Sequence, residues 1–208
     1  NSEEMTVRSF LLSNSLSEQY PKRLITSLYY DTNDYSYYLE SLDGVPNRQK
    51  IRARFYNNDS SQVTIEFKNK SANLGWKQYK SIQDYNENEL LYINAHNVFG
   101  DIPKLRLPIF INKRFIPTAL ISYSRRYFYC PLTDLRITFD YSILQGPARI
   151  NSKSIDIPYG VPSQHAVLEI KYDKQSNPSL PLIKKLTKEF GLILSSCSKY
   201  RQAISAIF

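Results

Sequence analysis

Lys50-Ile51-Arg52-Ala53-Arg54-Phe55 alternates between basic and apolar residues, and this alternation limits how the chain can fold. Successive side chains of a β-strand point to opposite faces, so residues two apart share a face. The stretch therefore predicts a strand with one apolar face and one basic face. A basic face that points inward would line a cationic cavity, whereas one that points outward would be solvated sheet surface.

Three further stretches also place charged residues two apart among apolar ones. They are Glu66-Phe67-Lys68, Arg136-Ile137-Thr138-Phe139-Asp140 and Glu169-Ile170-Lys171. Basic residues dominate these charged faces, and an acidic residue recurs in all three. If the faces converge, they form a cavity that suits a bound polyanion, with carboxylates that could hold a metal ion.

The charge of the chain agrees with an anionic ligand. Its 208 residues carry a formal net charge of +8, which favours nucleic acid, anionic lipid headgroups or polyphosphorylated small molecules. Nucleic-acid binders usually gather Lys and Arg into tails or along one helix. Here the basic residues are spread through predicted strands, which favours a pocket and disfavours nucleic acid.

The order of the predicted elements indicates an α+β fold in a single domain over residues 1–208. Pro21 should break the pattern before the first strand. The expected strands cover residues 24–30, 48–56, 62–69, 76–82, 118–130, 134–144 and 165–173. The expected helices cover residues 3–12, a short segment ending near 39, two pieces within 86–114, then 180–190 and 196–207. Gly191 is expected to end the helix at 180–190.

The three basic residues Lys50, Arg52 and Arg54 repel one another on one strand face. An outward face usually alternates charges to avoid this repulsion, whereas a bound anion would remove it, since Arg forms bidentate bonds with phosphate oxygens. Both interpretations stay open at this point, with about equal support from the strand pattern.

The acidic residues allow two interpretations as well. Glu66 with Lys68, and Glu169 with Lys171, could be ordinary surface ion pairs. Alternatively, both glutamates could hold Mg²⁺ or Mn²⁺, which prefer carboxylate oxygens and bridge to phosphates, while the lysines bind phosphate.

Several other site classes are disfavoured. His96 and His165 lack metal-ligand spacing, which predicts structural roles for both. Cys130 and Cys197 are far apart and predict buried free thiols in a reducing compartment. The sequence has no glycine-rich phosphate loop, nucleophile elbow or kinase signature. No stretch approaches the ~18 apolar residues of a membrane span.

From about residue 21 to the C-terminus, short motifs follow one another in a specific order. They are Tyr20-Pro21-Lys22-Arg23, Ser27-Leu28-Tyr29-Tyr30-Asp31-Thr32, Leu42-Asp43-Gly44, the basic strand 50–56, Glu66-Phe67-Lys68, Tyr123-Ser124-Arg125, Arg136–Asp140, Leu168-Glu169-Ile170-Lys171 and Ser198-Lys199-Tyr200. Together they resemble the VTC domain (vacuolar transporter chaperone, polyphosphate polymerase domain) of the triphosphate tunnel metalloenzyme or CYTH-like superfamily.

The resemblance implies an antiparallel β-barrel with a charged tunnel inside and helices outside. It further implies that ATP binds in the tunnel and that its terminal phosphate is transferred to polyphosphate. Glu169 would hold the divalent cation, with Glu66 as the other acidic candidate. By position, the phosphate-binding residues would be Arg52, Arg54, Lys68, Arg125, Arg136, Lys171, Lys199 and Lys77, with Lys80 disfavoured because it lies on the opposite strand face. The first six of these are also the catalytic candidates.

The start of the chain departs from the family. Family members begin with a strand of alternating Glu and Lys, whereas Glu3 and Glu4 here open a predicted helix. The first tunnel strand is therefore expected to be missing from this chain, and Asn1 without a preceding Met suggests a piece of a longer protein. We expect a cytoplasmic protein, or the cytoplasmic domain of a longer one.

Three functions follow from the resemblance and the charge pattern. The first is a Mn²⁺- or Mg²⁺-dependent phosphotransferase that synthesises polyphosphate from ATP. The second is a triphosphatase of the same fold. The third is a non-catalytic module that binds polyphosphate or inositol phosphates, which the small number of carboxylates favours.

Overall fold

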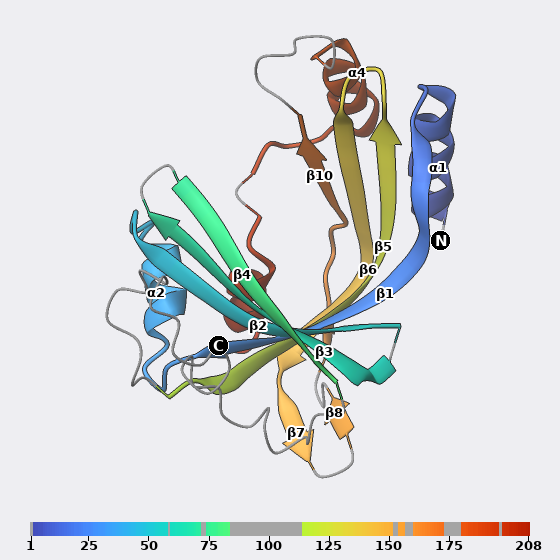
Figure 1. The fold of residues 1–208 in the computed structure, drawn as a ribbon. Coiled ribbons are helices and arrows are strands. Elements are labelled where there is room, and N and C mark those ends of the chain that lie inside the picture. Colours follow the sequence, from blue (N-terminus) through green and yellow to red (C-terminus); the bar gives the residue numbers. More distant parts are fainter. Residues whose placement is uncertain are drawn as a thin grey trace. The chain divides into compact units, whose positions relative to one another are not determined.

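The computed structural model describes residues 2–57, 59–71, 74–83, 114–151, 154–156, 160–172, 180–195 and 197–208 (Figure 1). These residues form an antiparallel sheet of eight strands, a two-stranded sheet and four helices, which confirms the α+β prediction. The helices are α1 (Ser2–Ser13), α2 (Ser36–Leu42), α4 (Leu180–Phe190) and α5 (Lys199–Ser205). None of these described helices is long and apolar enough to cross a membrane.

The strands of the large sheet follow the order β10-β6-β5-β1-β2-β3-β4, with β9 also paired to β6. Within the described residues, no pairing joins β10 to β4. The small sheet pairs β7 with β8. The strands are β1 (Ser17–Asp31), β2 (Arg48–Tyr56), β3 (Asp59–Ser71), β4 (Leu74–Gln83), β5 (Ile116–Cys130), β6 (Leu135–Pro147), β7 (Arg149–Asn151), β8 (Ser154–Asp156), β9 (Val161–Pro162) and β10 (Val167–Lys171).

The chain divides into two compact units. Unit 1 contains Asn1–Leu24, Tyr123–Ile143 and Ser163–Cys197, and unit 2 contains Ile25–Ser122, Leu144–Pro162 and Ser198–Phe208. Each unit has its own hydrophobic core, and each is described below by itself.

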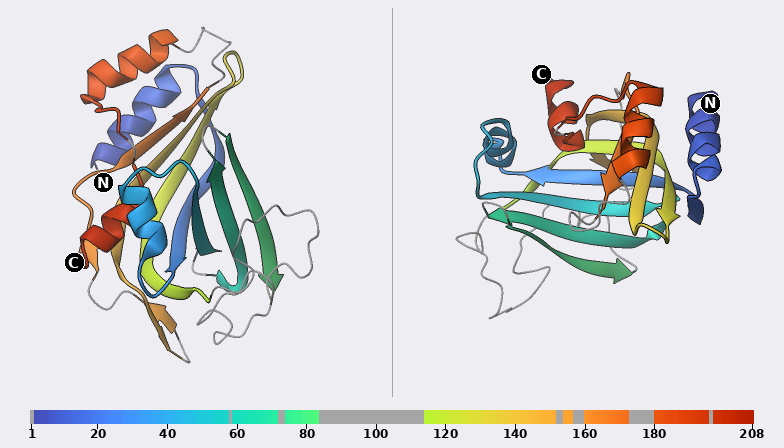
Figure 2. Two further views of the ribbon diagram at one scale, coloured as in Figure 1. Left: turned by 90° about the vertical axis from the view of Figure 1, so that its left-hand side faces the viewer. Right: turned by 90° about the horizontal axis from the view of Figure 1, so that it is seen from above.

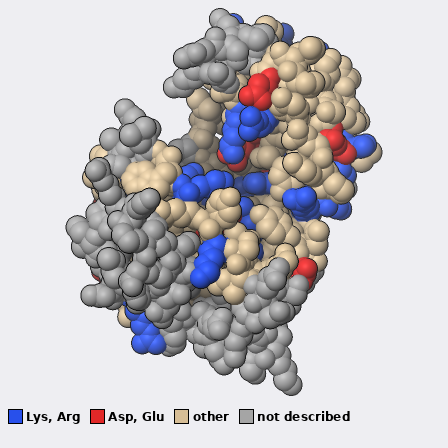
Figure 3. All heavy atoms as spheres, viewed as in Figure 1, with Lys and Arg blue, Asp and Glu red and all other residues tan. Residues whose placement is uncertain are grey.

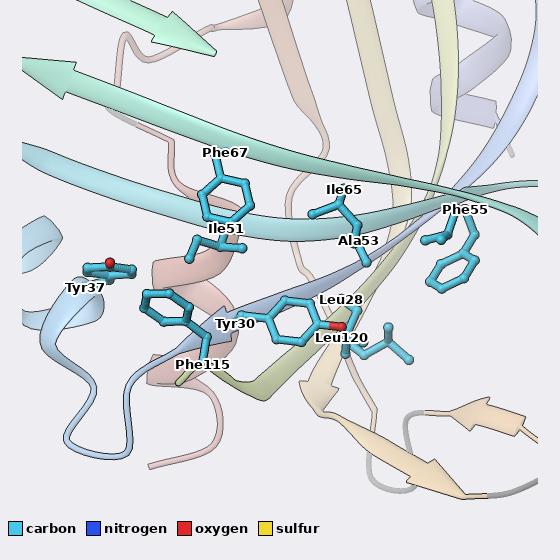
Figure 4. Packing of buried hydrophobic residues seen from close by; sticks show 11 residues of the cluster. Leu28, Tyr30, Tyr37, Ile51, Ala53, Phe55, Ile65, Phe67, Phe115 and Leu120 are labelled. Atoms are coloured by element: carbon cyan, nitrogen blue, oxygen red, sulfur yellow. The ribbon is translucent and has the colours of Figure 1, made fainter. Parts of the chain in front are cut away.

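The core of unit 2 lies against the apolar faces of β2 and β3 (Figure 4). Ile51, Ala53 and Phe55 alternate along β2 and are buried, as the alternation in the sequence predicts. Ile65 and Phe67 of β3 join them because they pair directly with Ala53 and Ile51. In the same unit, α2 and α5 lie side by side, with the Tyr38 and Ser205 hydroxyls 3.2 Å apart (Figure 2).

The core of unit 1 lies between helices and the apolar face of β6. Leu135, Ile137 and Phe139 supply this face, and Leu11 of α1 and Leu186 of α4 pack against it. Burying five such side chains removes most of their apolar surface from water, at roughly 1.5–3 kcal/mol each.

Most predicted element bounds are close to the observed ones, but two differ from them. The first strand begins at Ser17 and not at 24, so Pro21 lies inside β1 instead of before it. The residues of β1 that pair with β2 begin at Ile25, so Pro21 needs no N–H for that pairing. The last helix begins at Lys199 and not at 196, because Ser198 is its N-cap and accepts a 3.3 Å hydrogen bond from the Arg201 N–H.

The predictions for Gly191 and for the two cysteines fall on described residues, whereas those for 86–114 mostly do not. Gly191 ends α4 with a left-handed backbone (φ 57°), as predicted. The helices predicted within 86–114, and His96 with them, lie almost wholly outside the described residues. Cys130 and Cys197 are free thiols as predicted, but only Cys130 is buried.

Candidate functional site: two basic strand faces

In unit 2, strand pairing aligns four of the eight predicted phosphate-binding residues on one face. Directly paired residues of antiparallel strands share a face of the sheet. Lys50 pairs with Lys68, which pairs with Lys77, and Arg52 pairs with Glu66. We call this surface, opposite the core, the β2–β4 face; it contains Lys50, Arg52, Arg54, Glu66, Lys68 and Lys77. Lys80 instead pairs with Ile65 of the core side.

The two arginines of the β2–β4 face are not ordinary solvated side chains. Arg54 and Glu66 are each only 8% exposed. Glu66 Oε2 accepts hydrogen bonds from Arg52 Nε (3.1 Å) and Nη2 (2.6 Å), and Glu66 Oε1 lies 3.0 Å from Arg54 Nη1. One carboxylate therefore holds two guanidinium groups side by side, and the trio keeps a net positive charge.

The electrostatics of Glu66 follow from this arrangement. Burial raises the pKa of the Glu66 carboxyl, but Arg52 and Arg54 more than offset burial and lower it below its usual value. Glu66 is thus ionised at neutral pH, and both of its oxygens are engaged by arginines.

Tyr29 extends the β2–β4 face onto β1. It pairs directly with Arg52, and Arg52 Nη1 donates a 3.2 Å hydrogen bond to its hydroxyl. The Tyr29 ring stacks on the Tyr200 ring at 5.2 Å, and Tyr200 donates a 2.5 Å hydrogen bond to buried Asp31. Burial raises the pKa of Tyr29, yet the cations Arg52, Arg54 and Lys199 lower it overall. Lys199, the first residue of α5, therefore acts on the same face.

Lys50 is surrounded by other cations. Burial lowers the pKa of its ammonium group, and Arg48, Lys68, Arg201 and Arg52 lower it further, to about 8. Its Nζ donates a 2.8 Å hydrogen bond to Ser198 Oγ. A bound anion would stabilise the charged form of Lys50.

In unit 1, a second charged face runs over β5, β6 and β10. Arg136 pairs directly with Lys171, and Thr138 with Glu169. On the same side of β6, buried Asp140 accepts two hydrogen bonds from Arg125, at 2.5 Å from Nε and 2.7 Å from Nη2. We call this surface the β5–β6–β10 face. It brings together Arg125, Arg136, Glu169 and Lys171, all of them predicted.

The ion pairs of the β5–β6–β10 face differ in strength. Burial lowers the pKa of Arg125, but the bidentate contact with Asp140 raises it overall, so the Arg125 guanidinium group stays charged. In contrast, Glu169 Oε1 lies 3.2 Å from Lys171 Nζ with the two side chains 48% and 67% exposed. Arg136 contacts exposed Asp134 at 3.3 Å. Such exposed pairs contribute little free energy, so phosphate or a metal ion can replace the partner.

The two glutamates fit a divalent metal differently. Mg²⁺ and similar ions commonly bind through one or two carboxylates together with substrate phosphates. Glu169 is exposed and weakly paired, so it fits this role. Glu66 fits it poorly, because two arginines occupy its oxygens. Among the described residues, no group of three or more His, Cys, Asp or Glu could hold a metal ion without such phosphates.

Three residues that contact these faces, Tyr29, Tyr200 and Asp140, were not among the predicted site residues. Asp140 had a signal, because it lies two residues after Thr138 and four after Arg136 in one strand. Tyr29 and Tyr200 occur in two of the motifs quoted above, but nothing in the sequence indicates that their rings stack, since this contact joins β1 to α5. In the space-filling view, Lys and Arg gather on the face shown, with few Asp and Glu (Figure 3).

Comparisons with known proteins identify the family that the chain matches. The family model of the VTC domain matches residues 3–208. No curated protein has a significantly similar sequence.

Solved structures with a similar fold share little sequence identity with this chain. The Hippeastrum protein HpAC1, described as a candidate adenylyl cyclase with a dominant triphosphatase activity, is 13% identical, with a TM-score of 0.54 and coverage of 100% of this chain and 91% of that one. A candidate adenylate cyclase of Bacillus halodurans is 12% identical, with a TM-score of 0.54 and coverage of 96% and 91%. The PH1819 protein of Pyrococcus horikoshii OT3 is 11% identical, with a TM-score of 0.52 and coverage of 96% and 93%.

Proposed function

This chain belongs to the VTC domain family, and we propose that it is a metal-dependent phosphotransferase that synthesises polyphosphate from ATP. The observation that carries the proposal is the pair of arginines, buried Arg54 and part-buried Arg52, held side by side by Glu66 on the face opposite a hydrophobic core. A protein that needed these residues only for solubility would leave them exposed.

The chemistry asked of these residues is positioning and charge neutralisation. Phosphoryl transfer passes through a loose, metaphosphate-like transition state, so the protein contributes orientation and electrostatic stabilisation. Arg52 and Arg54 offer planar donors that match phosphate oxygens, and Glu66 orients them. The residues that we propose to contact phosphate are Arg52, Arg54, Lys68, Lys77, Lys199, Arg125, Arg136 and Lys171.

The family implies a divalent metal, and we assign it to Glu169, with Mn²⁺ or Mg²⁺ as the ion. When bound, the ion would neutralise charge on the phosphate oxygens. We assign Glu66 a positioning role, because its two oxygens already bind Arg52 and Arg54.

Triphosphate hydrolysis is the second candidate function. The triphosphatase activity that is described for the Hippeastrum protein favours it, since that protein shares the fold. A module that binds polyphosphate or inositol phosphates without turnover is the third, favoured by the few carboxylates on the two faces. A triphosphatase transfers the phosphoryl group to water and releases free phosphate. A polyphosphate-synthesising phosphotransferase transfers it to a phosphate chain and makes long polymer, so the products distinguish these two functions.

The test is incubation with ATP and Mn²⁺, followed by sizing of the products on a gel. We expect long polyphosphate from the wild-type protein and a loss of about 100-fold to 1,000-fold in turnover for Arg52→Ala, as is typical when one charge-stabilising donor is removed. Glu169→Ala should lose the metal-dependent part of the turnover. Free phosphate alone would favour the triphosphatase, and metal-independent binding without turnover would favour the binding module.

A further inference from the structure

A row of alternating tyrosines and arginines lies in unit 1 beside the Arg125–Asp140 pair. Tyr123, Arg125 and Tyr127 are two residues apart in β5 and so share a face. The Arg125 guanidinium carbon lies 5.3 Å from the centroid of the Tyr123 ring and 5.9 Å from that of the Tyr127 ring. The Arg125 guanidinium group therefore lies against two aromatic rings.

The row continues onto β1 through Tyr20. The Tyr20 and Tyr127 rings meet edge to face, with centroids 5.5 Å apart and an interplanar angle of 85°. Arg23 lies against both, with its guanidinium carbon 4.9 Å from the Tyr20 centroid and 5.7 Å from the Tyr127 centroid. Two neighbours thus fix the orientation of the Tyr20 ring.

Tyr20 remains 48% exposed in spite of these contacts. Arg23 is half-buried and forms no ion pair with any carboxylate in the described part of the chain. The exposed Tyr20 ring has a fixed orientation and a cation beside it. A flat partner that covers this aromatic surface therefore gains free energy from stacking.

We infer that Tyr20, oriented by Tyr127 and Arg23, is a stacking platform for the nucleobase of a nucleoside triphosphate whose phosphates bind at Arg125. This inference rests on the proposed function and adds a base subsite to it. Aromatic side chains and Arg are the groups on which nucleobases stack in nucleic-acid-binding proteins. The row supplies both, next to the cation that would bind the phosphates.

The platform predicts a specific kind of selectivity. Every base has a π-face, so stacking on Tyr20 tolerates any base. Inorganic polyphosphate has no base and gains nothing from the ring. Tyr20 therefore favours nucleoside triphosphates over inorganic chains of the same charge, which distinguishes a phosphate donor from a polymeric product.

The test compares two ligands that differ in the base. Calorimetry in Mg²⁺ buffer measures the dissociation constants of β,γ-imido-ATP and of tripolyphosphate for the wild-type protein and for Tyr20→Ala and Tyr20→Trp. We expect Tyr20→Ala to weaken binding of the nucleotide by about fivefold to 100-fold, which is the ~1–3 kcal/mol of one stacked base, and to leave tripolyphosphate binding unchanged. Tyr20→Trp, which keeps an aromatic face, should retain nucleotide binding.

The matched control is Tyr172→Ala, since Tyr172 is also in unit 1 and is 44% exposed. It should change neither constant. Equal losses for both ligands in Tyr20→Ala would assign the ring a structural role and overturn the inference, as would unchanged nucleotide binding. A wild-type protein that binds neither ligand would overturn the proposed function itself, and the base subsite with it.

Discussion

Arg52 and Tyr29 stand directly opposite each other on neighbouring strands, and Arg52 Nη1 donates a 3.2 Å hydrogen bond to the Tyr29 hydroxyl. Glu66 holds the other side of the same guanidinium group. Arg52 is therefore fixed between a carboxylate and a phenol before any ligand arrives. Preorganised donors of this kind avoid reorganisation when charge develops on a substrate.

Removing the Tyr29 hydroxyl should loosen Arg52 without disturbing the core. We predict that Tyr29→Phe weakens tripolyphosphate binding by about twofold to tenfold, since one hydrogen bond contributes about 0.5–1.5 kcal/mol. Calorimetry measures this change. The control is Tyr38→Phe, since the Tyr38 hydroxyl contacts Ser205 and not Arg52, and this variant should bind normally. Equal effects of the two substitutions would contradict the role given to Tyr29.

Glu66 should make stability depend on pH in the acidic range. Its pKa is lower in the folded protein than its usual value of 4.5. Its contribution is therefore complete above that value and is lost as the pH falls through the folded pKa. We predict that Glu66→Gln lowers the free energy of unfolding by about 1–3 kcal/mol at pH 7. Urea unfolding at several pH values should show the two proteins converging in acid; parallel curves would contradict this.

Lys50 should make ligand binding depend on pH in the basic range. Its pKa is lowered to about 8 in the free protein, and a bound anion favours its charged form. Binding of tripolyphosphate therefore takes up a proton above this pH, and affinity should fall as the pH rises through about 8. Lys50→Arg should remove this dependence and keep the affinity. A dissociation constant that titrates identically in both proteins would refute the assignment.

Lys77 and Lys80 lie on the same strand but on opposite faces, so they allow a matched comparison. Lys77 pairs with Lys68 on the β2–β4 face, whereas Lys80 pairs with Ile65. We predict that Lys77→Ala weakens tripolyphosphate binding and that Lys80→Ala, with the same loss of charge, does not. Filter binding at low ionic strength, where screening is weak, measures both. A larger loss for Lys80→Ala would contradict the role of the β2–β4 face.

The strand faces could be predicted from the sequence because side chains alternate between the two faces of a strand from one residue to the next. The alternation in β2 places Arg52 and Ile51 on opposite faces, and register follows once the apolar face is buried. Pro21 was misleading, because its missing N–H matters only where a neighbouring strand needs it. The stacking of Tyr29 on Tyr200 could not be predicted, since it depends on how the last helix packs against β1.

The most direct test of the central claim is the size of the product that forms from ATP and Mn²⁺. We predict long polyphosphate from the wild-type protein and almost none from Arg52→Ala, with thermal denaturation showing that both are folded. An Arg52→Ala protein that makes polyphosphate at the wild-type rate would contradict it.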